Sequence, residues 1–441
     1  MKILIKNPRV VVTQDPGRGI LRGESIYIED SIIKAVAPLE RLAGYDFDLE
    51  IDGRDMAVIP GLVNLHTHAT QIIARGLFDD YPLMSWLYRM DRFYEGMDDE
   101  AARAAARLAF IEGVLCGTTT FLDMEVQANQ VIEAALEVGV RLFEAVALVD
   151  TVETGPSGFP RTGDPEEVVE KAVQLALKFR NHPLVRVGLG PVGFPSSSPE
   201  LLRLASQAAR ENNLFIHTHL SESRVNERLA RKFYGVSETL LLEKLGVLSP
   251  RLVAAHAVNV SALDIDTLAK HGVSVAHCPS SNAKLANGIA PALRMISRGL
   301  NVGLGTDGAA SNNTMDMFQE MRVFTLMQRA LSRETLASAQ QALDAATVNG
   351  ARALGLEDRL GVVKPGAYAD LVLLDLKAPF MEPPANTVGN LVFSGACRAV
   401  KNVIVAGRLL VYDGVPADEE LAARAVESFE EHFDGLQNRL Y

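Results

Sequence analysis

The sequence predicts a (β/α)8 barrel joined to a small β-sandwich that is built from both ends of the chain. In the central part, apolar runs of strand length alternate with helical stretches, which is typical of βα units. The two ends instead show short strands separated by turns. Several central strands also end in residues that can bind a metal, at the edge where barrels place their active sites. We therefore divide the chain into residues 1–56, 57–364 and 365–441.

Strands of the predicted sandwich lie at both ends of the sequence. At the N-terminal end they cover 3–12, 25–29 and 32–36, and at the C-terminal end they cover 370–375, 389–393, 400–406 and 407–412. Turn residues such as Asp15-Pro16-Gly17 separate them. Residues 417–440 have the apolar spacing of an amphipathic helix, which we expect to pack on the outside.

The barrel prediction depends on eight apolar runs in the central part. They lie at 57–65, 118–124, 141–149, 185–191, 214–220, 252–256, 273–277 and 302–306, with helical stretches such as 99–115, 166–179 and 199–212 between them. A doubly wound open sheet is the alternative. We favour the barrel because the candidate ligands come from strands one, five and eight, and only closure brings the first and last strands together.

Composition describes an ordinary globular enzyme and excludes some partners. The 441 residues are 48% hydrophobic and 22% charged, enough for one large and one small domain. A net charge of -12 argues against a nucleic-acid partner, which needs a basic surface. No run approaches the ~18 apolar residues of a membrane helix. The widely spaced Cys116, Cys278 and Cys397 predict no disulfide framework, so we expect a reducing, cytoplasmic location.

Two histidines at the end of the first barrel strand are the strongest functional signal. His66 and His68 are separated by one residue, and alternate side chains of a strand point the same way. Both imidazoles can therefore reach one metal ion. His219 and Asp307 end later strands in the same manner. The four side chains form a three-nitrogen, one-carboxylate set for one divalent metal, zinc first, with iron or manganese as alternatives.

Three further roles complete the predicted chemistry. Glu222, three residues after His219, is the candidate proton carrier, although it could instead be a solvated residue at a helix start. We expect His256 to contact the metal-bound water or the charge that develops on the substrate, unless it is a core histidine. Asp307 also has a catalytic role, as acceptor of a hydrogen bond from the attacking water. His217 is predicted to lie beside the ligands or in the barrel interior.

The sequence resembles the amidohydrolase superfamily over nearly its whole length, and within it the methylthioadenosine/S-adenosylhomocysteine deaminase and atrazine-type chlorohydrolase group. The motifs that carry the resemblance are Pro60-Gly-Leu-Val-Asn-Leu-His-Thr-His68, Gly117-Thr-Thr-Thr, His219-Leu-Ser-Glu222, Ala255-His256, Pro279-Ser-Ser-Asn-Ala-Lys-Leu285 and Gly305-Thr-Asp-Gly-Ala-Ala-Ser-Asn-Asn313. The resemblance implies a mononuclear metal hydrolase on a (β/α)8 barrel, a homo-oligomer, and the same roles for the ligands, Glu222 and His256.

The expected reaction is the release of ammonia from a purine, adenosine-like or related N-heterocycle, by attack of a metal-bound hydroxide. Removal of chloride or an alkylamine from a triazine-like ring is an alternative, because only the leaving group differs. An alternative of another class is a catalytically silent scaffold with this fold. The retention of the ligands and of Glu222 argues against the scaffold.

Substrate contacts are predicted on two segments. In the loop after strand one, Trp86 offers a flat face to a heterocycle and Glu95 could accept two hydrogen bonds from a diol. The competing interpretation buries Trp86 in a core or interface and leaves Glu95 solvated. His277 and Asn282, at and after strand seven, are the other candidates. Val192 stands where the family commonly has a histidine, so the resemblance implies the chemistry more directly than the substrate.

Overall fold

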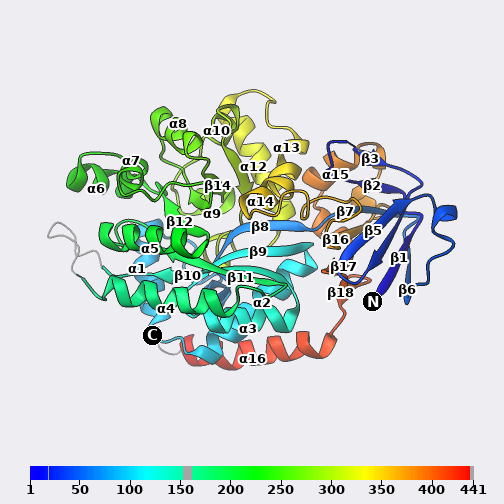
Figure 1. Ribbon diagram of the computed structural model, residues 1–441, viewed down its shortest axis with the longest axis horizontal. Coiled ribbons are helices and arrows are strands. Elements are labelled where there is room, and N and C mark those ends of the chain that lie inside the picture. The colour runs from blue at the N-terminus through cyan, green and yellow to red at the C-terminus, as the bar shows by residue number, and fades with distance from the viewer. Residues whose placement is uncertain (18, 152–160, 438–441) are drawn as a thin grey trace.

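The computed structural model describes all residues except 18, 152–160 and 438–441 (Figure 1). Its centre is an eight-stranded parallel sheet in which the strands follow their sequence order. The strands are β8 (Leu62–Thr67), β9 (Thr118–Glu125), β10 (Arg141–Leu148), β11 (Val185–Pro191), β12 (Ile216–Leu220), β13 (Leu252–His256), β14 (Ser274–His277) and β15 (Asn301–Leu304). A doubly wound sheet would reverse its order partway, so the predicted barrel is confirmed.

Hydrogen bonds near the carboxyl ends of β8 and β15 close the barrel. The side-chain amide of Asn64 donates to Oγ1 of Thr306 at 2.7 Å, and the backbone N–H of Thr306 donates back to Oδ1 of Asn64 at 3.0 Å. The N–H of Asp307 donates to the carbonyl of His66 at 2.9 Å. Closure therefore places Asp307 next to His66, at the end of the first barrel strand.

The predicted first strand, 57–65, proved to be two strands in different sheets. β7 (Met56–Pro60) pairs with β16 (Leu371–Asp375) of the terminal module, and only β8 belongs to the barrel. Gly61 is the residue between the two strands. The backbone passes so close to Thr119 that only glycine fits, because a Cβ on residue 61 would lie 2.1 Å from the Thr119 hydroxyl oxygen. The apolar run is continuous since both strands are buried, so periodicity could not show the break.

Helices cover the barrel, as predicted. They are α1 (Leu83–Tyr94), α2 (Asp99–Leu115), α3 (Ala128–Val138), α4 (Pro165–Lys178), α5 (Pro199–Asn212), α6 (Arg224–Tyr234), α7 (Glu238–Lys244), α8 (Ala262–Lys270), α9 (Pro279–Lys284), α10 (Ala292–Ser297), α11 (Ala309–Asn312), α12 (Met317–Ser332), α13 (Ala339–Ala345) and α14 (Val348–Ala353). Local capping explains why two predicted helices have the expected bounds. The side chain of Asp98 caps α2, and Ser198 caps α5 directly before Pro199.

Two sheets from both ends of the chain form the terminal module, on the right of Figure 1. The four-stranded sheet holds β5 (Ile32–Ala37), β4 (Ser25–Glu29), β1 (Lys2–Lys6) and β6 (Leu49–Asp52), and the seven-stranded sheet holds β19 (Val415–Pro416), β18 (Arg408–Tyr412), β17 (Val400–Val405), β16, β7, β2 (Val10–Val12) and β3 (Ile20–Leu21). One buried cluster joins them, with Ile5 and Ile28 against Leu373 and Ile404. The prediction of a sandwich from both termini is confirmed, while the exact domain boundaries stay a prediction.

One predicted strand of this module, 389–393, is wrong. Residues Thr387–Phe393 form helix α15, whose start is capped by Asn386 through the N–H of Gly389. Val388, Leu391 and Val392 are buried at helical spacing. A short apolar run fits either structure, and here the cap and the packing favour the helix.

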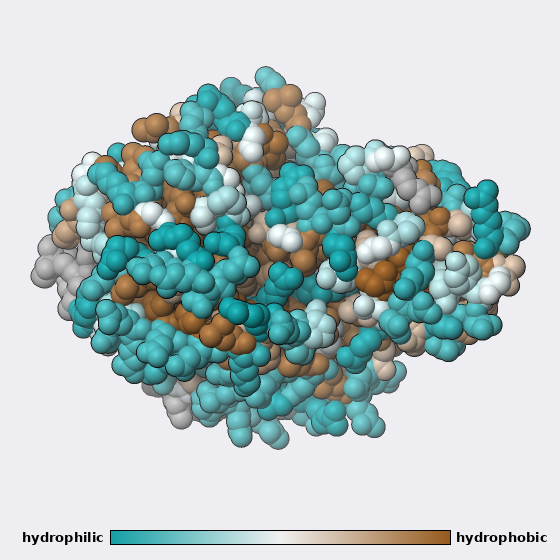
Figure 2. Space-filling view, viewed as in Figure 1, coloured by the Kyte–Doolittle hydropathy of each residue, from teal (hydrophilic) through white to brown (hydrophobic). Residues whose placement is uncertain are grey.

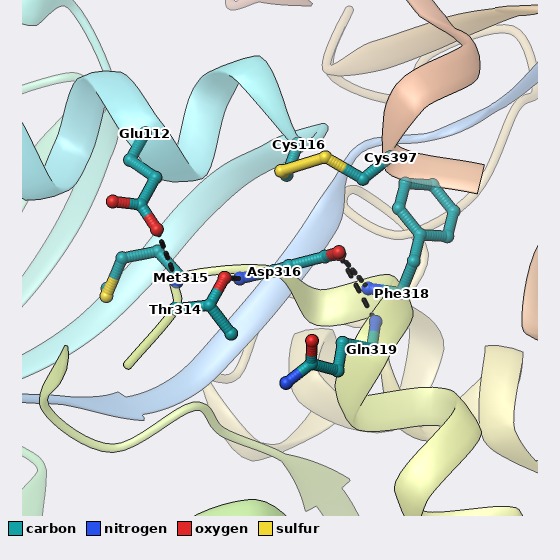
Figure 3. The surroundings of a disulfide bond; sticks show 8 residues. All are labelled: Glu112, Cys116, Thr314, Met315, Asp316, Phe318, Gln319 and Cys397. Atoms are coloured by element: carbon teal, nitrogen blue, oxygen red, sulfur yellow. Dashed lines mark hydrogen bonds between the residues drawn. A yellow bond between two sulfur atoms is a disulfide. The ribbon is translucent and has the colours of Figure 1, made fainter. Parts of the chain in front are cut away.

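Two contacts fasten the terminal module to the barrel. At the start of β10, Arg141 makes a buried bidentate ion pair with Asp370, with Nε 2.9 Å from Oδ2. Cys116, after α2, forms a disulfide with Cys397 in the 3-10 helix Ala396–Ala399 (Figure 3). The sequence predicted no disulfide, because the two cysteines are 281 residues apart and nothing in the sequence shows that their segments meet.

The last helix, α16 (Glu419–Gln437), packs outside the barrel against α2 (Figure 1), and the described part agrees with the predicted helix at 417–440. On the face drawn in Figure 2 the surface is mainly hydrophilic, with hydrophobic residues in small groups. Among the described residues, no helix combines the length and the apolar character that a membrane span requires.

Candidate metal centre

The predicted ligands come together at the carboxyl end of the barrel. Donor atoms of His66, His68 and Asp307 all lie within 4.8 Å of one another, and so do those of His66, His219 and His256. Nε2 of His66 is 3.4 Å and Nε2 of His68 is 3.7 Å from the same oxygen, Oδ1 of Asp307. Strand alternation on β8 and barrel closure thus produce one compact cluster from distant parts of the chain.

Hydrogen bonds fix which nitrogen of each histidine is free. Nδ1 of His68 lies 2.7 Å from the carbonyl of Met124, and Nδ1 of His219 lies 2.6 Å from the carbonyl of Val192. A carbonyl only accepts, so both Nδ1 atoms carry the proton and both Nε2 atoms hold a lone pair. These two Nε2 atoms are 3.1 Å apart. Two lone pairs this close repel each other, and a cation that binds both nitrogen atoms would remove the repulsion.

His66 reaches the same state through a relay. Nδ1 of His217 lies 2.8 Å from the carbonyl of Val253, so Nε2 of His217 accepts, and Nδ1 of His66 donates to it at 2.7 Å. Nε2 of His66 is buried and has no partner within the described part of the chain. The donor set therefore fits a divalent metal, with His217 beside the ligands as predicted.

Burial keeps the imidazoles of His66, His217 and His219 neutral, which is the form in which an imidazole binds a metal. It holds the pKa of His66 and of His219 well below the usual range, and lowers that of His217 to about 3. Burial alone would raise the pKa of Asp307, but the nearby histidines, His66 above all, hold it well below the usual range. Neutral nitrogens and an ionised carboxylate are the metal-binding forms of these groups.

Two of the predicted site residues have an unusual backbone conformation. His256 has φ of 70° and Asp307 has φ of 62°, in the left-handed region that L-residues rarely adopt. Such positions persist where the surrounding structure determines them, and they gather at functional sites. For Asp307, the bonds from its N–H to His66 and from the Thr67 hydroxyl to its carbonyl supply that support.

Glu222 and His256 stand beside the ligand cluster, each held by an asparagine. Asn287 donates to Oε1 of Glu222 at 2.9 Å, and Nδ1 of His256 lies 2.9 Å from Oδ1 of Asn282. Burial raises the pKa of Glu222, while His256 and the bond from Asn287 oppose the rise. A carboxyl group poised in this way can take up and release a proton.

The four predicted substrate contacts occupy different environments. Trp86 is buried on the inner side of α1, with only 4% of its surface exposed, and Glu95 is exposed at the end of the same helix. His277 is buried beside Phe324, and burial lowers its pKa to about 3. The side-chain oxygen of Asn282 accepts a hydrogen bond from His256, and its Nδ2 has no hydrogen-bond partner among the described residues.

Sequence reasoning missed three buried carboxyl groups next to the metal strand. Oδ1 of Asp123 accepts from the N–H of Ala69 at 2.7 Å, and Oε1 of Glu125 accepts from the N–H of Thr70 at 3.0 Å. Glu144 on the next strand accepts from the N–H of Glu125. Asp123 and Glu125 hold the turn that follows His68, and Glu144 bonds the end of β9. Acidic residues in otherwise apolar strands were the available signal.

A barrel with a histidine and aspartate metal cluster at its carboxyl end defines the class of metal-dependent barrel hydrolases. Residues 57–410 match the model of the amidohydrolase family, and the chain belongs to that family. This confirms the resemblance drawn from the sequence motifs.

Similar proteins include deaminases and a chlorohydrolase. The chain is 36% identical to a 5-methylthioadenosine/S-adenosylhomocysteine deaminase of Halothermothrix orenii, over 94% of this chain and 95% of the relative. A zinc-bound adenosine deaminase structure from Xanthomonas campestris has a TM-score of 0.90 at 29% identity, covering 98% of both chains. The zinc complex of the atrazine chlorohydrolase TrzN from Arthrobacter aurescens TC1 has a TM-score of 0.89 at 27% identity, covering 97% of this chain and 100% of that one.

Proposed function

We propose that this protein is a metal-dependent aminohydrolase that releases ammonia from adenosine-like nucleosides. The observation that carries the proposal is the cluster of three imidazoles whose Nε2 atoms are left unprotonated around Asp307, with Glu222 beside it. The deaminase relative, which aligns over 94% of this chain, supports the reaction and the substrate class. The metal ligands proposed are His66, His68, His219 and Asp307.

We further propose one zinc ion, because zinc accepts three nitrogens and a carboxylate and is bound in two structural neighbours. When bound, such a metal lowers the pKa of water and supplies a nucleophile near neutral pH. Iron or manganese would suit the same ligands. Elemental analysis should find about one metal ion per chain, and a fully active, metal-free preparation would overturn this assignment.

The protein's own groups would then move the protons. Oε1 of Glu222 is held by Asn287, which leaves Oε2 to accept a proton from the attacking water and pass it to the ring nitrogen. Nδ1 of His256 faces Asn282, so Nε2 remains to contact the attacking water or the substrate. Ser281 donates to Oδ2 of Asp307 at 2.6 Å and fixes the carboxylate that orients the water. The second proton of the water would pass to the amino group, which leaves as ammonia while the ring carbon forms a C=O bond.

Recognition of the substrate is proposed for Trp86, Glu95, His277 and Asn282. The first two lie on α1, which begins beside the α9 region through a bond from the N–H of Leu83 to the carbonyl of Leu285. Cytoplasmic location and homo-oligomerisation also stay predictions. The cytoplasmic prediction assumed that the cysteines form no disulfide. The Cys116–Cys397 disulfide counts against that assumption, since disulfides are rare in reducing compartments.

A screen for ammonia release tests the proposed function. The panel should contain adenosine, 5'-methylthioadenosine, S-adenosylhomocysteine, adenine and an aminotriazine, each with the metal-loaded enzyme. We expect ammonia from the adenosine nucleosides. Chloride or alkylamine release from triazines in place of ammonia would establish the alternative that the chlorohydrolase neighbour suggests. No turnover of any compound by metal-loaded protein would favour the scaffold.

A further inference from the structure

One short segment touches three groups of the proposed active site at once. The α9 segment, defined here as residues 279–287, lies after β14. Within it, Ser281 bonds Asp307 at 2.6 Å, Asn282 faces His256 at 2.9 Å, and Asn287 bonds Glu222 at 2.9 Å. The three partners lie at the ends of three barrel strands. His256 is the last residue of β13, while Glu222 follows β12 and Asp307 follows β15. The segment therefore spans every strand end that supplies a later catalytic group.

We propose that Asn287 is a positioning residue for the general acid–base, holding Oε1 of Glu222 so that Oε2 faces the reacting atoms. The proposal rests on the proposed function, in which Glu222 carries the proton. Asn287 is buried, with 9% of its surface exposed, and its bond to Glu222 is made through Nδ2. A hydrogen bond to a buried carboxylate selects one rotamer of a flexible side chain, which is what proton transfer over a fixed path requires.

Backbone geometry fixes Asn287 itself. Its N–H donates to the carbonyl of Asn282 at 2.9 Å, so the residue that holds Glu222 is tied to the residue that holds His256. Its two neighbours, Ala286 and Gly288, have φ of 58° and 117°. A turn with two residues in these conformations has few alternative backbone arrangements. The side-chain amide of Asn287 is therefore attached at a defined position.

The rest of the α9 segment is anchored on both sides. Nζ of Lys284 donates to Oδ1 of Asp79 at 2.7 Å and to the carbonyl of Ala310 at 3.1 Å, and it also bonds Asn313. These partners lie in the loop after β8 and in the residues that follow Asp307. The segment is thus held against the residues that follow the first and the last barrel strands, so the same structure positions Asn287 and the proposed ligands.

Two substitutions test the proposal, and one of them, Asn287→Asp, is nearly isosteric. Asn287→Ala removes the donor, and we expect kcat to fall about 10- to 100-fold, the value of a hydrogen bond to a charged group, with KM and metal content little changed. Asn287→Asp keeps the shape but places a second acceptor against Glu222, so it should be at least as damaging. If Asn287 only fills space, Asn287→Asp would behave like the unaltered enzyme.

A double-mutant cycle identifies the partner. In a Glu222→Gln background, Asn287→Ala should lower kcat much less than it does alone, because both changes impair the same proton transfer. Additive losses would overturn the coupling. Asn390→Ala is the control, since the side-chain amide of Asn390 also donates hydrogen bonds, in its case to two backbone carbonyls, but lies on α15. It should leave kcat unchanged.

The same cycle separates two kinds of failure. If Glu222→Gln alone leaves turnover near normal, the proposed proton carrier is wrong and Asn287 loses its role with it. If Glu222→Gln abolishes turnover while Asn287→Ala and Asn287→Asp do not, the proposed function stands and only the positioning role fails.

Discussion

Nδ1 of His66 lies 2.7 Å from Nε2 of His217, deep in the barrel where neither side chain is exposed. The carbonyl of Val253 fixes the proton on the other nitrogen of His217, so His217 can only accept from His66. The pair is thus a device that presents a lone pair on Nε2 of His66 to the metal site. In the proposed ligands His68 and His219, hydrogen bonds to backbone carbonyls leave the same lone pair on Nε2.

This relay predicts that His217 controls metal affinity without touching the metal. His217→Phe keeps the ring volume but removes the acceptor, and loss of such a supporting bond typically weakens metal binding about 10- to 100-fold. Titration of the loaded protein with a competing chelator measures the change. His432→Phe on α16 is the control, because Nδ1 of that histidine lies 2.6 Å from the carbonyl of Ser428 in its own helix and its Nε2 lies 3.7 Å from Glu100. Equal metal affinity in His217→Phe and the unaltered enzyme would refute the relay.

Glu222 is expected to set the acidic limb of the pH–rate profile. Burial raises its pKa, so the limb should lie above the range of an ordinary carboxyl group. As the pH falls through this pKa, Glu222 becomes protonated, can no longer take the proton from water, and kcat/KM falls. Glu222→Gln should keep the metal and lose about 10²–10⁴ in rate. Steady-state rates with elemental analysis test this, and a variant with nearly normal rates would assign Glu222 to the helix start only.

Much of this arrangement could be predicted from the sequence because it depends on local rules. Alternation on one strand places His66 and His68 together, and barrel closure follows from the order of strands and ligands. Helices with side-chain caps, such as α2 after Asp98, have the predicted bounds. These features are decided within a few residues or by the topology of the whole fold.

The features that were missed depend on contacts between distant segments. The strand predicted at 389–393 became a helix because its apolar residues pack at helical spacing, which the short run does not reveal. Asn287 meets Glu222 across 65 residues, and Cys116 meets Cys397 across 281. No spacing rule predicts such pairs, since loops between barrel elements vary in length and direction.

The disulfide should contribute to stability but not to catalysis. Cys397→Ser opens a cross-link between residues 281 positions apart, and such a loss typically costs about 2–4 kcal/mol through the entropy of the unfolded chain. Thermal unfolding with and without reductant measures it. Reductant should lower the midpoint of the unaltered protein and leave that of Cys397→Ser unchanged. If reductant affects neither, the two thiols are not joined in solution.

The last prediction concerns Glu95, which is exposed at the end of α1. The helix follows the first metal strand and begins against the α9 segment, so its end belongs to the region where barrel enzymes shape their substrates. A carboxylate there could accept two hydrogen bonds from the ribose diol. Glu95→Ala should then lower kcat/KM about 10- to 100-fold for adenosine nucleosides and much less for free adenine, which has no diol.

Paired assays on a riboside and its free base give this result directly, because both contain the same reacting ring. Glu100→Ala is the matched control, since Glu100 is also exposed but lies in the first turn of α2. Equal losses for riboside and base would mean that Glu95 acts on the fold and not on the sugar. No loss for either would remove Glu95 from the site and favour a substrate without a ribose.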